Sequence, residues 1–179
     1  IEYLTVYGFS TENWKRSEEE VGALMQLFRF YMKKLITVDN DNNVRAKMIG
    51  ERSRFPKDIQ KGIAELEEST KANTGMLFSF AVNYGGRDEI IRAIHRIALE
   101  STPSELIEKL SHLTEEEFSK YLDTAGTPDP DLVIRTSGEF RTSNFLLWQS
   151  AYAEYYISSV YWPDFNLEEL EKAISSYQN

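Results

Sequence analysis

The sequence predicts an α/β fold in a single domain, with a mostly parallel central sheet and helices on both faces. Three observations support this class. Short apolar runs rich in β-formers alternate along the 179 residues with segments of helical apolar spacing. No internal repeat and no linker interrupts the alternation. Strands that alternate with helices are typical of parallel sheets, because each helix returns the chain to begin another strand in the same direction.

Four apolar runs are predicted to be strands. Tyr3–Phe9 is rich in β-formers and reads as a buried strand. Val44–Ile49 carries two alternating basic residues, which indicates a strand near the sheet edge. Met76–Val82 is continuously apolar, as in the middle of a parallel sheet. Leu132–Ile134 has the length and composition of a short buried strand.

Helix signals separate these strands. Ser17 and Glu20 form a capping box that starts a helix, and its apolar positions continue at helical spacing to Leu35. This apolar face is wider than one core needs, so the helix could line an apolar tunnel or could simply be well buried. A turn cluster follows at Asp39–Asn43. Further helices are predicted after Pro56, after Asp88, within the acidic stretch 101–126 and from Asn166.

The composition excludes several classes of function. The chain has no cysteine and only two histidines, which excludes disulfides and thiolate sites and argues against a zinc site. A net charge of −9 argues against general nucleic-acid binding. No apolar run approaches the roughly 20 residues of a membrane span. We therefore expect a cytoplasmic protein, with a peripheral contact at the inner face of the plasma membrane as a further expectation.

Three polar loops follow apolar strands, at residues 10–16, 83–88 and 135–144. Parallel strands bring their carboxyl ends to one edge of the sheet, where α/β proteins bind ligands. Arginine offers forked donors that suit phosphate oxygens, and the third loop contains two. Because the apolar run Phe145–Trp148 comes next, the sequence predicts a ligand with a charged head and an apolar body. Gly85–Gly86 could bring a phosphate to a helix N-terminus, but a tight turn is favoured.

Glu154 lies within the aromatic run 152–156. A carboxylate that is buried among aromatic side chains needs a partner for its charge. A divalent metal is one such partner, since Mg²⁺ commonly uses one or two carboxylates together with substrate phosphates. An ion pair with one of the arginines is the alternative, and both stay open.

Four segments carry a resemblance to a known family. They are FSTENWKRS at 9–17, NYGGRDE at 83–89, DPDLVIRTSGEFRTSNFLLWQSAYAE at 129–154 and WPDF at 162–165. Together they resemble the cis-prenyltransferases, the family of bacterial undecaprenyl diphosphate synthase. The likeness extends over nearly the whole chain, and the long third segment is highly specific.

The resemblance implies an activity. Enzymes of this family add isopentenyl diphosphate units to farnesyl diphosphate with cis geometry and use Mg²⁺, and the undecaprenyl diphosphate product is the lipid carrier for cell-wall synthesis. The resemblance also implies a homodimer and no nucleic-acid partner. The alternative is a non-catalytic accessory subunit of a heteromeric enzyme. Retention of Asn13, Arg135, Arg141 and Glu154 favours the enzyme.

The resemblance further implies roles for individual residues. Ser10 and Asn13 would be catalytic, and Trp14 and Arg16 would bind substrate from a mobile loop. Glu154 would bind the metal. The isopentenyl diphosphate head would be held by Arg135, Arg141 and Ser143. The product tunnel would be lined by Gly8, the helix 21–35 and the strand 76–82.

Two parts of the family pattern are missing from residues 1–179, which would form one cis-prenyltransferase domain. A DGNGRWA-like segment with a metal-binding aspartate would precede Ile1, and an Arg-x-Gly tail would follow Asn179. Smaller departures are Ser17, where the family usually has proline, and Glu51, where it usually has aspartate. Neither of these two exchanges threatens the chemistry.

Overall fold

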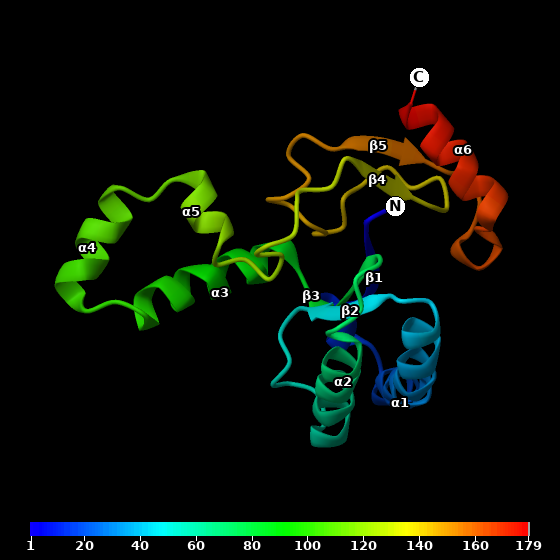
Figure 1. Cartoon of the computed structure of the whole chain (residues 1–179), viewed down its shortest axis with the longest axis horizontal. Helices are drawn as coiled ribbons and strands as arrows, with labels where there is room; N and C mark the ends of the chain where they lie inside the picture. The colour runs from blue at the N-terminus through cyan, green and yellow to red at the C-terminus, as the bar shows by residue number, and fades with distance from the viewer. Residues whose placement is uncertain (179) are drawn as a thin grey trace. The chain divides into compact units, whose positions relative to one another are not determined.

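The computed structural model describes residues 1–178. The chain divides into two compact units, one of residues Ile1–Ala125 and one that begins at Gly126, and Figure 1 shows the elements of both. The predicted α/β class with parallel strands is confirmed. The described strands nevertheless pair in two parallel sheets, where the sequence predicted one. Apolar runs identify strands, but they do not say which strands pair.

The first unit contains a three-stranded sheet in the order β1-β3-β2. Strands β1 (Tyr3–Ser10) and β2 (Arg45–Ile49) both pair parallel with β3 (Leu77–Tyr84). The central place predicted for residues 76–82 and the edge place predicted for residues 44–49 are therefore confirmed. The predicted burial of β1 is wrong for most of its length, since Tyr3 and Leu4 are 45% and 37% exposed. Among the described strands β1 pairs on one side alone.

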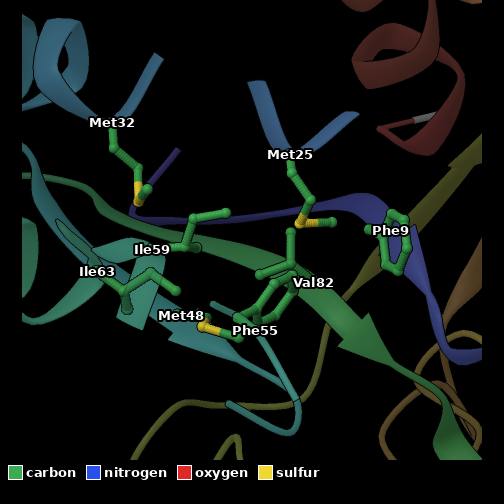
Figure 2. Packing of buried hydrophobic residues seen from close by; sticks show 8 residues of the cluster. All are labelled: Phe9, Met25, Met32, Met48, Phe55, Ile59, Ile63 and Val82. Atoms are coloured by element: carbon green, nitrogen blue, oxygen red, sulfur yellow. The ribbon is translucent and has the colours of Figure 1, made fainter. Parts of the chain in front are cut away.

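Helices α1 (Glu18–Asp41) and α2 (Lys57–Thr70) pack against each other and against β2. Their inner faces meet one face of the sheet in a hydrophobic core that Figure 2 shows from close by. Its buried members are Phe9, Met25, Met32, Met48, Phe55, Ile59, Ile63 and Val82. Met25 and Met32 recur at helical spacing in α1, and Ile59 and Ile63 do so in α2. One stripe of each helix therefore reaches the core. Helices on the other face of the sheet stay a prediction.

The ends of α1 test two sequence signals. The Ser17–Glu20 capping box begins the helix as predicted. The predicted turn at Asp39–Asn43 begins too early, because α1 continues to Asp41. The side-chain amides of Asn40 and Asn42 donate to the carbonyls of the preceding turn, which supports the last turn of the helix. Asn43 then takes a left-handed backbone with φ of 55° and ends it.

Three helices complete the first unit. Helix α3 (Gly86–Leu99) follows β3 after a single residue, and α4 (Pro103–Ser111) and α5 (Glu115–Ser119) lie in the acidic stretch, as predicted. Thr102 and Thr114 cap α4 and α5 through capping boxes. The segment after α5 is joined to α3 by ion pairs, since Asp123 accepts from two arginines of that helix.

The second unit is built on two short strands. Strand β4 (Leu132–Arg135) pairs parallel with β5 (Glu154–Ile157), in the register Leu132 to Glu154 and Arg135 to Ile157. A 3₁₀ helix, η2 (Trp162–Asp164), and helix α6 (Leu167–Tyr177) follow. The Asn166 side chain accepts from the backbone of Glu169, which confirms the predicted cap of the last helix.

Candidate functional site

The residues assigned to the site from the sequence fall in both units. Ser10, Asn13, Trp14 and Arg16 belong to the first unit, and residues 135–154 belong to the second.

The first group forms a tight turn at the carboxyl end of β1. A 3₁₀ helix, η1 (Thr11–Lys15), begins there. The backbone N–H of Ser10 donates to Oδ1 of Asn13 at 2.7 Å. Ser10 and Asn13, the two predicted catalytic residues, are therefore brought together. The backbone hydrogen bonds of a 3₁₀ helix have poorer geometry than those of an α-helix. The hydrogen bond between Ser10 and Asn13 therefore contributes to holding the shape of the turn.

Trp14 anchors this turn to the core. Its indole N–H donates to Oδ1 of Asn83 at 2.7 Å. Its ring lies 5.0 Å from the ring of Phe9 and 5.6 Å from that of Phe55, both core residues visible in Figure 2. The guanidinium of Arg54 lies 4.5 Å from the ring centre, within the range of a cation–π interaction. The half-buried indole is thus held in the core rather than free on the surface.

Arg16 directly follows η1 and is exposed. Within residues 1–178 its guanidinium has no ion-pair partner. On a chain of net charge −9, an arginine that no carboxylate neutralises leaves its charge available to an anionic ligand.

The polar loop predicted at residues 83–88 is much shorter in the structure. Only Gly85 separates β3 from α3, and Gly85 and Gly86 are both buried. The tight-turn interpretation is therefore confirmed, and the start of α3 is covered by protein. Asp88 lies in the first turn of α3 and pairs with Arg92 at 2.7 Å.

A buried polar network lies beside this turn, and sequence reasoning assigned it no role. The hydroxyl of Tyr7 donates to the carbonyl of Tyr84, and the hydroxyl of Tyr84 donates to Glu89, which is fully buried. Burial raises the pKa of Tyr7, and a hydrogen bond with Ser10 opposes that shift. Burial, with the charge of Glu89 beside it, raises the pKa of Tyr84. Both tyrosines are therefore neutral donors at physiological pH. The NYGGRDE motif contained two of these residues, but only packing reveals their contact.

In the second unit, Arg135 ends β4. Its side chain is half-buried and has no ion-pair partner within residues 1–178. Its carbonyl accepts from the backbone of Ser158 at 2.8 Å, and the next residues continue alongside the chain that leaves β5. Ser137 and Gly138 then take left-handed backbone conformations, which bend the chain sharply. The polar loop therefore begins at the carboxyl end of a parallel strand, as predicted.

Arg141 and Ser143 lie farther along the same loop. Arg141 forms an ion pair with Glu139, and both side chains are largely exposed. Exposed ion pairs contribute little, with a median near 0–1 kcal/mol. A more strongly charged partner, such as a diphosphate, could therefore take the place of Glu139. Ser143 and Asn144 both have positive φ, which makes this part of the loop a tight polar turn.

Glu154 lies at the other end of the small sheet. It opens β5 opposite Leu132, whereas Arg135 closes β4 opposite Ile157. Along the paired strands, Glu154 and Arg135 are three residue positions apart, which corresponds to roughly 10 Å. Glu154 is exposed and has no ion-pair partner within residues 1–178, so the ion-pair alternative is not observed.

The donor set was also compared with the needs of Mg²⁺. In the described part of the chain, no three or more histidine, cysteine, aspartate or glutamate side chains gather as a metal site would require. Mg²⁺ commonly takes only one or two protein carboxylates and completes its shell with phosphate oxygens and water. A single exposed carboxylate such as Glu154 is compatible with that mode of binding, in which the substrate supplies further ligands.

Comparison with known proteins places the chain in a family. Residues 1–179 match the family described as "Putative undecaprenyl diphosphate synthase". An isoprenyl transferase of Clostridium perfringens is 50% identical over 179 residues, which cover all of this chain and 70% of that protein. The chain belongs to the cis-prenyltransferases. It is therefore an isoprenyl transferase of the undecaprenyl diphosphate synthase family.

Two solved structures are similar to this cis-prenyltransferase. One, from Campylobacter jejuni, is described as a "probable undecaprenyl diphosphate synthase"; it has a TM-score of 0.87 and 36% identity, and the match covers 100% of this chain and 81% of that one. The other is lavandulyl diphosphate synthase from Lavandula x intermedia in complex with dimethylallyl diphosphate. Its TM-score is 0.92 and its identity 35%, with 99% of this chain and 76% of that chain covered. Within residues 1–178, no helix combines the length and the apolar character that crossing a membrane requires.

Proposed function

We propose that this cis-prenyltransferase condenses isopentenyl diphosphate units onto farnesyl diphosphate with cis geometry and makes undecaprenyl diphosphate, the lipid carrier for cell-wall synthesis. The observation that carries the proposal is Arg135. It ends a parallel strand, opens a polar loop and has no ion-pair partner within residues 1–178 of an acidic chain. A half-buried arginine in that setting favours a ligand with several anionic oxygens.

The head of isopentenyl diphosphate is assigned to the loop after β4. Arg135 supplies a guanidinium that no carboxylate of the described residues 1–178 pairs with. Arg141 supplies a second one, once the diphosphate takes the place of Glu139. Ser143 supplies a hydroxyl from the tight turn of the same loop. Two arginines and a hydroxyl offer several donors to the diphosphate oxygens and hold them in one orientation.

The turn after β1 is assigned to the allylic substrate. Ser10 and Asn13 would fix the reacting groups in place, since their own hydrogen bond holds the turn together. Trp14 would contribute an apolar surface, and Arg16 would contact the diphosphate of the allylic substrate. Residues that follow Trp14 are exposed, which leaves them able to close over the bound substrate.

Glu154 is assigned to Mg²⁺, together with oxygen atoms of the substrate. When bound, the metal neutralises negative charge on the diphosphate. The exposed carboxylate of Glu154 would bind and orient that cation from the protein side.

The proposed reaction breaks the bond between the allylic carbon and its diphosphate oxygen, and the diphosphate leaves with the bonding electron pair. The double bond of the isopentenyl unit forms a new bond to that carbon. A proton then passes from the isopentenyl unit to an oxygen of the released diphosphate, and the electron pair of the broken C–H bond forms the new double bond. Arg16, in the role assigned to it here, would stabilise the charge that develops on the leaving diphosphate. The aromatic side chains around Trp14 would keep water away from the cation-like carbon.

An apolar tunnel is proposed for the growing chain, lined by Gly8, α1 and β3. Helix α1 buries one apolar stripe in the core but leaves Leu27, Phe30, Tyr31 and Val38 exposed. A helix that is simply well buried would not leave so much apolar surface outside the core, so this exposure supports the tunnel interpretation. Each buried CH₂ group of the product would contribute about 0.8 kcal/mol. We further propose a homodimer with a peripheral contact to the membrane that receives the lipid.

The test is a transfer assay with product sizing. Because the relatives extend beyond the matched segment, the chain is assayed alone and joined to the flanking segments of the C. perfringens protein. Each form is incubated with Mg²⁺, radiolabelled isopentenyl diphosphate and either farnesyl or dimethylallyl diphosphate. The second primer is included because the lavandulyl diphosphate synthase structure contains it.

We expect farnesyl diphosphate to be extended to the length of the undecaprenyl product. A shorter product would overturn the undecaprenyl assignment and leave the transferase class intact. If neither form incorporates label while circular dichroism shows folded protein, the alternative of a non-catalytic accessory subunit replaces the proposal.

A further inference from the structure

Asn83 joins three segments that leave the carboxyl ends of the three-stranded sheet. It lies near the end of the central strand β3 and is 3% exposed. Its Oδ1 accepts from the indole of Trp14, in the turn after β1, at 2.7 Å. Its Nδ2 donates to the carbonyl of Glu51, in the turn after β2, at 2.8 Å. One side-chain amide therefore bridges the chains that follow both neighbouring strands.

The backbone around Asn83 is specialised for this arrangement. Asn83 has a φ of 46°, a left-handed conformation that asparagine tolerates better than most residues. Its carbonyl accepts from the backbone of Glu51 at 3.1 Å, so the two residues are joined twice. Gly50 allows this close approach, because a Cβ atom there would lie 2.0 Å from the carbonyl oxygen of Val82. The turn after β2 is thus held against the end of β3.

Trp14 connects Asn83 to the turn that contains Ser10 and Asn13. The indole can rotate little, since the rings of Phe9 and Phe55 and the guanidinium of Arg54 surround it. Asn13 precedes Trp14 and accepts from the backbone of Ser10. The hydrogen bond to Asn83 therefore determines how deep the indole sits, and with it where Asn13 and Ser10 lie at the end of β1.

We propose that Asn83 is a positioning residue for prenyl transfer, which acts through Trp14 on the turn that contains Ser10 and Asn13. This rests on the proposed function, which takes that turn as part of the active site. Asn83 itself needs no contact with substrate. Loss of Asn83 removes the partner of the half-buried indole N–H and releases the turn. It should therefore lower kcat more than it changes KM for isopentenyl diphosphate, whose head is assigned to other residues.

The experiment compares Asn83→Gly with a matched control, Asn43→Gly. Glycine accepts the left-handed backbone at both positions and removes the side chain together with its hydrogen bonds. Asn43 also has positive φ and also bridges two segments, through Thr74, but it precedes β2, at the amino end of the sheet. Both variants are made in the form that shows transfer activity, and thermal unfolding checks that each is folded.

Two readouts are measured on each variant. The first is hydrogen exchange of the Trp14 indole N–H by NMR, a signal assigned by its loss in Trp14→Phe. The second is steady-state kinetics. For Asn83→Gly we expect indole exchange to be at least about tenfold faster and kcat to fall about tenfold, with KM for isopentenyl diphosphate within about twofold. Asn83→Gly removes two part-buried hydrogen bonds, with Trp14 and with Glu51, and an effect of about tenfold is the size expected for such a loss. Asn43→Gly should leave both readouts within twofold.

A double-mutant cycle tests the route through Trp14. Trp14→Phe keeps an aromatic ring and removes the N–H, so Asn83→Gly should lower kcat by no more than about twofold in that background. Additive effects would overturn the proposal, as would unchanged indole exchange or unchanged kcat in Asn83→Gly. If the unchanged protein shows no transfer, the proposed function fails and the positioning role fails with it. The indole readout alone would then report whether the contact between Asn83 and Trp14 exists.

Discussion

The arginines of this chain differ in whether a carboxylate of the protein neutralises the charge of the guanidinium group. Arg92 and Arg96 share Asp123, at 2.7 Å in each case. Burial alone would lower the pKa of Arg92, but its hydrogen bonds to Asp123 and Asp88 outweigh burial and raise it. Arg135 has no such partner within residues 1–178. The first two therefore serve the architecture, whereas the charge of Arg135, like that of Arg16, is left for a ligand.

Replacing Arg135 with alanine tests that difference. Charge-assisted hydrogen bonds contribute about 1.5–3 kcal/mol, so we expect KM for isopentenyl diphosphate to rise about 10–100-fold. Kinetics with varied isopentenyl diphosphate measure this. Arg45→Ala is the control, since Arg45 is exposed at the amino end of β2. Equal kinetics for Arg135→Ala and the unchanged protein would remove Arg135 from the site.

Asp39 illustrates a residue whose environment opposes its charge. It is buried in the last turn of α1, and its Oδ2 has no hydrogen-bond partner among residues 1–178. Burial raises the pKa of its carboxyl above the ordinary value. The carboxylate also lies at the negative end of the helix dipole. Its ionised form therefore costs stability.

We expect Asp39→Asn to raise the free energy of unfolding at neutral pH by about 1 kcal/mol. The pKa of Asp39 is higher in the folded protein than in the unfolded chain, where it is about 3.9. Below that pH the carboxyl opposes folding least, and its unfavourable effect grows as pH rises through the folded pKa. The gain from the variant should thus shrink as pH falls towards 4. Urea unfolding at several pH values measures it, and a variant that is less stable at pH 7 would contradict the prediction.

At the scale of elements, glycines decide where strands and helices can approach. Gly50 follows β2 with a φ of 120°, and a Cβ atom there would collide with the end of β3. Gly22 lies in α1 with no atom within 4 Å of such a Cβ. The same residue type is thus required at one position and only tolerated at the other.

Alanine at these two positions should have opposite effects. Gly22→Ala should stabilise the protein by about 0.5–1 kcal/mol, because alanine has the higher helix propensity and the site has room. Gly50→Ala should destabilise it by more than 1 kcal/mol, since both the backbone conformation and the collision oppose it. Thermal and urea unfolding measure both variants. An increase in stability for Gly50→Ala would show that the approach of β2 to β3 is looser than described.

At the scale of the whole molecule, one buried carboxylate joins distant parts of the first unit. Asp123 follows α5 and accepts from Arg92 and Arg96 of α3 and from the backbone of Gly50 after β2. Burial would raise the pKa of Asp123, but its bonds from Arg92 and Arg96 outweigh burial and lower it. The segment after α5 is therefore held to the sheet end by charge rather than by apolar packing alone.

Removing this charge should be costly. We expect Asp123→Asn to lower the free energy of unfolding by about 3 kcal/mol at neutral pH, because it leaves two buried or half-buried arginines short of a partner. The pKa of Asp123 is lower in the folded protein than in the unfolded chain, where it is about 3.9. The stabilisation by its carboxylate is therefore present above the unfolded pKa and is lost as pH falls through the folded pKa. The unchanged protein should therefore lose more stability than the variant between pH 5 and 2. If the free energy of unfolding falls equally with pH in the unchanged protein and in Asp123→Asn, this role is refuted.

Local signals in the sequence predicted much of the fold correctly, because they depend on neighbours along the chain. The caps at Ser17, Thr114 and Asn166 each begin a helix as expected. The central strand 76–82 and the edge strand 44–49 followed from their apolar patterns. The end of α1 was misplaced, because Asn40 and Asn42 bind the helix they were expected to end.

The sequence by itself determined the α/β class and the family motifs, since these depend on periodicity and residue type. The residues assigned to diphosphate chemistry followed from the family resemblance and stay a prediction. Tertiary structure alone decided that the described strands form two sheets, that Arg135 lacks an ion pair within residues 1–178 and that Asp123 joins three segments. It also brought Asn83 to Trp14, 69 positions apart in the chain. The physical reason is that hydrogen bonds and ion pairs between distant segments depend on packing, which has no local pattern in the sequence.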